Sequence, residues 1–96
     1  MTVWTAGRVR AALDLPPGPN DGVTFAGIST DSRALAPGTL FVALAGDRFD
    51  GHDYLEAAAG AGATGVVVRQ GARVPPGVVA FEVPDTLKAF GLLARA

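Results

Sequence analysis

The 96-residue chain contains no cysteine, only one histidine and only one lysine, and it has no long run of apolar residues. The absence of cysteine excludes disulfides, thiolate metal sites and a cysteine nucleophile. No window approaches the roughly 18 apolar residues of a membrane span, and the N-terminus lacks the basic start and apolar run of a signal peptide. We therefore expect a cytoplasmic protein without a membrane span.

An excess of charge of one sign is also missing. The formal net charge is −1, and the eight basic residues are spread along the chain. Because no basic stripe is available to neutralise a run of phosphates, we expect no nucleic-acid partner. Nearly half of the residues are apolar and 18% are charged. This balance predicts a single packed domain over residues 1–96.

Motifs that mark a reaction centre are missing as well. The phosphate loop G-x-x-x-x-G-K-[ST] does not occur, and the only lysine, Lys88, lies in a predicted helix. The run Gly60-Ala61-Gly62 lacks the third glycine and the strand-to-helix position of a dinucleotide site. No Ser-His-Asp motif and no His/Cys metal spacing is present. We predict a segment with no catalytic residue, cofactor site or metal site of its own.

The pattern of apolar and turn-forming residues predicts an α/β fold. Strands are expected over residues 23–29, 40–44, 66–68 and 78–83. Helices are expected after Thr5 as N-cap, behind a capping box of Asp53 and Glu56, and after Asp85. The last helix is expected to bury the stripe Leu87, Phe90, Gly91 and Ala94. Helical crossovers indicate some parallel pairing, so we expect a small mixed β-sheet flanked by helices.

A first polar cluster, Ser29-Thr30-Asp31-Ser32-Arg33, follows the first predicted strand. Loops in this position commonly carry binding sites. Hydroxyls donate to phosphate or to a base carbonyl, and the planar guanidinium of arginine suits phosphate. The alternative is a turn held by local bonds from Asp and Ser side chains to the backbone. Composition alone leaves both interpretations open.

The second cluster runs from Gly46 to Asp53 and is rich in charge, with glycines that let the backbone approach a ligand. It is suited to cradle a sugar or a nucleotide. Phe49 either stacks on a ring or anchors the loop in the core. His52 has Asp50 and Asp53 beside it, but no second His or Cys completes a metal shell. We expect His52 to make an orienting hydrogen bond.

Together, these spaced motifs resemble the N-terminal domain of the Mur ligases, which build the peptidoglycan precursor. The likeness is carried by the runs at residues 27–33, 37–44 and 46–54, and by Gly62-Ala63 before Val66-Val67-Val68. Several motifs in the right order are more specific than any one of them. Thr39 stands where the family more often has an acidic or polar residue, and we expect it at the surface.

The resemblance implies that the chain is one domain of a three-domain ligase. In that family, ATP activates a peptide carboxylate as an acyl phosphate, and an incoming amine attacks it. The ATP loop, the Mg²⁺ ligands and the amine site belong to the central and C-terminal domains. The N-terminal domain holds the UDP-N-acetylmuramoyl-peptide, so these 96 residues are expected to bind substrate without performing chemistry.

The resemblance also assigns candidate binding residues. By position, Thr30, Ser32 and Arg33 match the first substrate-binding motif of the family. The second set, Asp47, Arg48 and Phe49, matches the loop that closes on the uridine diphosphate.

Two family members share this type of domain. The Phe-Asp-Gly-His run and the closing residues 83–94 are more similar to the ligase that adds D-alanyl-D-alanine. The alternative is the ligase that adds the third residue, diaminopimelate or lysine. An alternative from another class is a non-catalytic interaction module that docks on a partner through an apolar face of the last helix.

Overall fold

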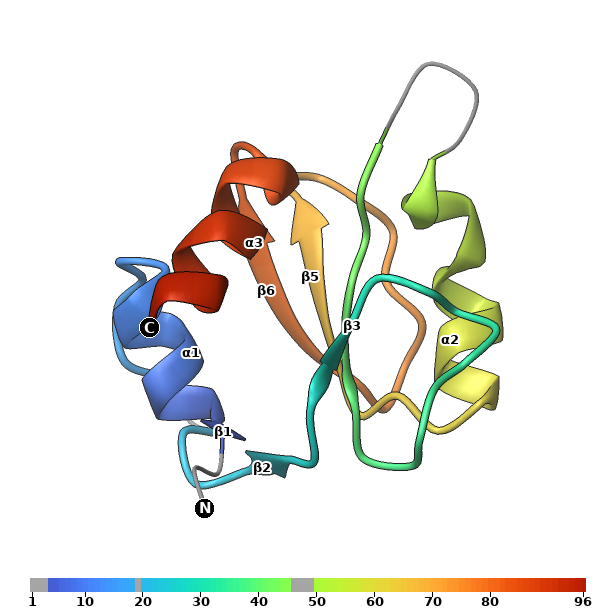
Figure 1. Cartoon of the computed structure of the whole chain (residues 1–96), viewed down its shortest axis with the longest axis horizontal. Coiled ribbons are helices and arrows are strands. Elements are labelled where there is room, and N and C mark those ends of the chain that lie inside the picture. The colour runs from blue at the N-terminus through green and yellow to red at the C-terminus, as the bar shows by residue number, and fades with distance from the viewer. Residues whose placement is uncertain (1–3, 19, 46–49) are drawn as a thin grey trace.

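The structure, a computed structural model, describes residues 4–18, 20–45 and 50–96. A parallel sheet of order β3-β4-β5-β6 stands at its centre, with helices on both sides (Figure 1). Its strands are β3 (Ile28–Ser29), β4 (Leu40–Val42), β5 (Gly65–Arg69) and β6 (Val79–Val83). A separate antiparallel pair joins β1 (Trp4–Thr5) to β2 (Thr24–Phe25). The predicted α/β class is confirmed, with parallel and antiparallel pairing placed in two different sheets.

The strand expected over residues 23–29 divides between these two sheets. Phe25 in β2 pairs with Trp4, whereas Ile28 in β3 pairs with Leu40. The Ala26 N–H donates to the Gly38 carbonyl at 2.9 Å, so the connection between the two short strands is itself held against the start of β4. The apolar pattern is continuous across the break, which explains why the sequence predicts one strand.

Two predicted helix starts meet different outcomes. Helix α1 (Ala6–Ala12) begins after Thr5, whose Oγ1 accepts from the Arg8 N–H at 3.0 Å, as predicted. The capping box of Asp53 and Glu56 is wrong. A 3₁₀ helix, η1 (Gly51–Tyr54), comes first, and α2 (Leu55–Gly60) follows it without a side-chain cap. Asp50 is the cap instead, because the chain already turns at Gly51.

The last helix, α3 (Thr86–Arg95), is capped by Asp85, which accepts from the Lys88 N–H at 3.1 Å. Its buried residues are Thr86, Ala89 and Leu93, while Leu87 is 66% exposed and Ala94 is exposed. The predicted stripe was therefore wrong at Leu87 and Ala94, whereas Phe90 is partly buried and packs against the core. This helix carries apolar residues on most of its sides, so their periodicity alone does not predict which face packs against α1 and β5.

Each face of the parallel sheet has its own core. Towards α1 and α3, the rings of Phe25 and Phe81 meet edge to face, with centroids 6.0 Å apart. Towards α2, the buried residues are Phe41, Ala43, Leu55, Ala58, Ala63, Val66 and Val68. Because β4 and most of β5 are buried on both faces, they appear in the sequence as continuous apolar runs.

Thr39 belongs to the interior and not to the surface, contrary to our expectation. Its exposed fraction is 5%, and its Oγ1 donates to the Ala36 carbonyl at 2.6 Å. The turn at Ala36-Pro37-Gly38 brings this hydroxyl to a backbone acceptor, so it is hydrogen-bonded although it is buried. Gly38 in that turn has φ +84°, a conformation that favours glycine.

Candidate functional site

The carboxyl ends of the parallel strands lie at one edge of the sheet (Figure 1). Residues Thr30–Arg33 follow β3, Ala45 lies beyond β4, Arg69 ends β5, and Asp85 follows β6. In open α/β sheets, ligands bind outside this edge. Both polar clusters identified in the sequence leave the sheet here.

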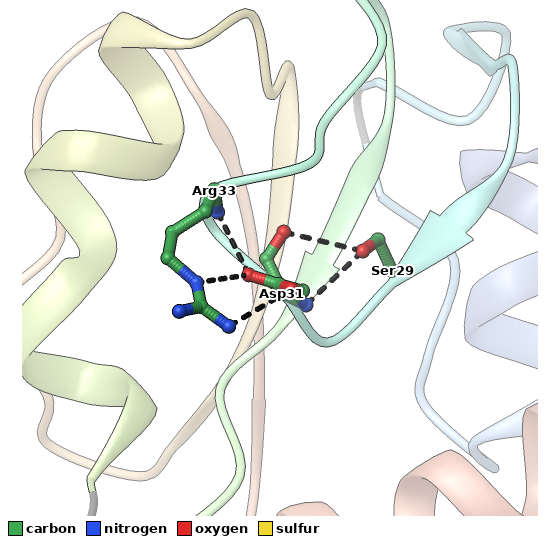
Figure 2. Close-up of polar contacts among 3 residues, drawn as sticks. All are labelled: Ser29, Asp31 and Arg33. Atoms are coloured by element: carbon green, nitrogen blue, oxygen red, sulfur yellow. Dashed lines mark hydrogen bonds and ion pairs between the residues drawn. The ribbon is translucent and has the colours of Figure 1, made fainter.

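The first loop is organised by Asp31 (Figure 2). The Asp31 N–H donates to the Ser29 Oγ at 3.1 Å, and the Arg33 N–H donates to the Asp31 Oδ1 at 2.9 Å. The Arg33 Nε also donates to that oxygen, at 3.1 Å. The local turn that the sequence allowed is therefore present. In this turn the guanidinium also lies against the Asp31 carboxylate, with Nη2 3.4 Å from Oδ2.

Asp31 and Arg33 each stabilise the ionised form of the other. Hydrogen bonds from the Arg33 side chain, and then from its backbone, hold the pKa of Asp31 below its usual value. The Asp31 carboxylate raises the pKa of Arg33 in turn. The side chains are 46% and 87% exposed, so the pair contributes little to stability. Its consequence is local: an exposed guanidinium, hydrogen-bonded to Asp31, lies at the surface of the site.

A surface depression of about 450 Å³ lies beside this loop and is lined by Thr30, Asp31, Ser32, Arg33 and Tyr54. It brings together Thr30, Ser32 and Arg33, the first set of predicted binding residues. Asp31 and Tyr54 were not assigned a binding role from the sequence. Tyr54 ends η1 and is 42% exposed, and only the fold places it beside the first loop. The depression thus combines hydroxyls, a cation and an aromatic ring.

The second set of predicted residues, Asp47, Arg48 and Phe49, lies outside the described residues. The two flanks of their loop are described and are joined to each other. Ala45 and Asp50 form an antiparallel bridge, and the Gly51 N–H donates to the Leu44 carbonyl at 2.7 Å. The loop therefore leaves and re-enters the fold at a single closed base.

His52 makes the orienting hydrogen bonds that were predicted. Its Nδ1 lies 2.6 Å from the Asp50 Oδ1, and its Nε2 accepts from the Arg69 N–H at 2.9 Å. Within the described ranges, no group of three His, Cys, Asp or Glu side chains could hold a metal ion. Within the same ranges, none of the helices has the length and apolar character needed to cross a membrane.

The ionisation of Asp50 predicts that the stability of the fold depends on pH. The His52 N–H and then the His52 side chain lower the pKa of Asp50 from 3.8. The stability that this carboxylate contributes is therefore complete above that value and is lost as the pH falls through the lower folded-state pKa. We expect Asp50→Asn to unfold with a weaker pH dependence below about pH 4 than the parent chain. Urea denaturation over that pH range measures the free energy of unfolding. If this free energy fell equally with pH in the variant and in the parent chain, the assignment would be contradicted.

Comparison with known proteins finds a matching family model and similar sequences. A family model described as "Mur ligase family, catalytic domain" matches residues 24–96. A UDP-N-acetylmuramoyl-L-alanyl-D-glutamate--2,6-diaminopimelate ligase of Gloeobacter violaceus is 41% identical over 75 residues, which are 77% of this chain. A UDP-N-acetylmuramoyl-tripeptide--D-alanyl-D-alanine ligase of Escherichia coli is 42% identical over 73 residues, or 75% of this chain. The chain spans 15% and 16% of these two relatives.

Solved structures show the same fold. A crystal structure of MurF from Acinetobacter baumannii superposes with a TM-score of 0.78 at 27% identity, covering 96% of this chain and 20% of that one. MurF ligase from Thermotoga maritima, in complex with ADP, gives a TM-score of 0.61 at 29% identity, covering 71% of this chain and 16% of that one.

Proposed function

The chain belongs to the Mur ligase family, and from that premise we propose that it is the domain that holds the UDP-N-acetylmuramoyl-peptide substrate of a peptidoglycan-precursor ligase. One observation carries the proposal. The depression at the carboxyl edge of the sheet gathers Thr30, Ser32 and Arg33, the residues that match the substrate motif of the family. The bound group is the UDP end of the substrate.

The chemistry of the depression suits a uridine diphosphate. The exposed Arg33 guanidinium is held in place by Asp31 and offers a cation to the diphosphate. The hydroxyls of Thr30 and Ser32 are donors for phosphate or for a base carbonyl. The ring of Tyr54 supplies an aromatic surface beside them. Binding a remote handle in this way helps to position the peptide carboxylate that reacts elsewhere.

Catalysis is assigned to other domains of a longer cytoplasmic enzyme. The sequence has no phosphate loop, and its relatives are several times longer than these 96 residues. ATP and Mg²⁺ would act in a central domain, and the amine would bind in a C-terminal domain. The three-domain organisation and the amide-ligase reaction are part of this proposal. The contribution of this chain is recognition of the nucleotide-linked substrate.

Within the family, we assign the chain to the ligase that adds D-alanyl-D-alanine. The MurF structure that superposes over 96% of the chain supports this choice. The diaminopimelate ligase of Gloeobacter violaceus, 41% identical, supports the alternative. A full-length protein that carries this chain would decide between them. It should ligate D-alanyl-D-alanine, and ligation of 2,6-diaminopimelate or lysine in its place would establish the alternative.

Removing the cation should weaken binding. We expect Arg33→Ala to bind UDP-N-acetylmuramoyl-tripeptide about tenfold more weakly than the parent chain, because a charge-assisted hydrogen bond to phosphate is lost. Isothermal titration calorimetry measures the change. The matched control is Arg95→Ala, which removes the same charge from the last turn of α3. Equal loss in both variants would show a general charge effect and contradict the assigned site.

One observation favours the interaction module. A hollow of about 650 Å³ lies between the end of α1 and α3, with Leu13, Lys88 and Leu92 in its lining. A module that docks through this surface has no need of a nucleotide. If the folded chain binds a partner protein but gives no heat with UDP-N-acetylmuramoyl-tripeptide, the module becomes the better account.

A further inference from the structure

We propose that His52 is a positioning residue for the loop between β4 and η1. Its neutral imidazole, protonated on Nδ1, links Asp50, at the end of that loop, to Arg69, at the end of β5. The effect on binding rests on the proposed function, because the loop carries Asp47, Arg48 and Phe49. The contacts of His52 with Asp50 and Arg69 stand independently of it.

The hydrogen bonds determine the tautomer. The side chain of His52 is 8% exposed, so its ring nitrogens depend on protein partners. A backbone N–H can only donate, and Nε2 accepts the Arg69 N–H at 2.9 Å, so this nitrogen carries its lone pair. The proton must then lie on Nδ1, which donates to the Asp50 Oδ1 at 2.6 Å. A ring flip or a second proton would break one of these bonds.

The imidazole takes the place of a backbone acceptor in the parallel ladder between β4 and β5. The Ala43 N–H donates to the Val67 carbonyl at 3.0 Å, just beyond the last paired residue of β4. In a parallel ladder, the next N–H on this side of β5 belongs to Arg69, two residues further on. The Arg69 N–H instead donates to the His52 Nε2. His52, which lies in η1, thus supplies the acceptor in place of β4.

Asp50 ties the other end of the imidazole to the loop. Its carboxylate accepts from the His52 N–H at 2.9 Å as well as from the ring, and its Oδ2 lies 3.7 Å from the Arg69 Nη2. A hollow of about 200 Å³ beside this cluster is lined by Ala45, His52 and Arg69, and by the start of α3, including Asp85. The cluster therefore joins the base of this loop, where Ala45 follows β4, to Arg69 at the end of β5.

The tautomer can be observed directly, because His52 is the only histidine in the chain. In a long-range ¹H–¹⁵N spectrum, we expect Nδ1 to carry the proton and Nε2 to be bare. Free histidine prefers the reverse. A proton on Nε2 would overturn the proposed arrangement, whatever the chain binds.

The functional part is tested by replacing the two ring nitrogens separately. His52→Gln keeps an acceptor for Arg69, His52→Asn keeps a donor for Asp50, and His52→Ala keeps neither. We expect His52→Ala to bind UDP-N-acetylmuramoyl-tripeptide about three- to tenfold more weakly, the range produced by losing one or two net hydrogen bonds. The Gln variant should recover part of the affinity and the slow hydrogen exchange of the Arg69 amide.

A matched control separates positioning from stability. Thr5→Ala removes the N-cap of α1 and destabilises the fold without touching the loop, so its affinity should equal that of the parent chain. Parent-like binding by His52→Ala would overturn the positioning role. Equal weakening by Thr5→Ala would also overturn it, since stability alone would then explain the loss. A parent chain that does not bind would instead overturn the proposed function.

Discussion

Alanine at Gly51 is expected to lower the free energy of unfolding by about 3 kcal/mol, the upper end of the usual range for overpacking. A Cβ on this residue would lie 2.9 Å from the Ala43 Cα and from the Leu44 N, and 3.0 Å from the Leu44 O. All three neighbours are backbone atoms of the chain leaving β4, so no side chain can rotate away. Relief requires the bond from the Gly51 N–H to the Leu44 carbonyl to lengthen or break.

Urea denaturation of Gly51→Ala measures this cost, and Gly60→Ala is the matched control. Gly60 lies in α2 with nothing within 4 Å of an added Cβ, so alanine there should stabilise the helix by up to about 1 kcal/mol. Opposite signs for the two substitutions are the expected result. A Gly51→Ala variant as stable as the parent would show that the base of the second loop is not closely packed.

Phe81→Ala is expected to cost about 3–5 kcal/mol, the usual range for deleting a buried phenylalanine. The residue is completely buried in β6, on the face that packs against α1 and α3. Its ring meets Phe25 edge to face at 6.0 Å, and the Arg10 guanidinium lies 5.0 Å from its centroid. Truncation leaves a cavity between sheet and helices, and it removes the contact that links β2 to β6.

The control for Phe81 is Leu87→Ala, a large apolar side chain on α3 that is 66% exposed. A surface substitution of this kind should change stability by no more than about 0.5 kcal/mol. Denaturation of both variants gives the comparison. If Phe81→Ala were no more destabilising than Leu87→Ala, the described core on this face of the sheet would be wrong.

Local signals in the sequence were sufficient where neighbours along the chain decide the structure. Thr5 as N-cap and the buried strand at Leu40 depend on residues within a few positions, and both were confirmed. The break between Phe25 and Ile28 was not visible, because Trp4 and Leu40 select their partners through tertiary pairing.

The site shows the same division. The loop from Thr30 to Arg33 was found because it follows a strand and carries hydroxyls beside a guanidinium. Tyr54 was overlooked as a lining residue, because η1 brings it to the depression from 21 positions beyond Arg33. The orienting role of His52 was predicted, but its partner Arg69 follows only from the parallel pairing of β4 with β5.

The most direct test of substrate recognition is an NMR titration of the ¹⁵N-labelled chain with UDP-N-acetylmuramoyl-tripeptide. We expect the largest amide shifts at Thr30, Ser32 and Arg33, with accompanying shifts at Arg48 and at Tyr54, the only tyrosine. Shifts confined to the hollow between α1 and α3, around Leu13 and Lys88, would contradict the proposed site.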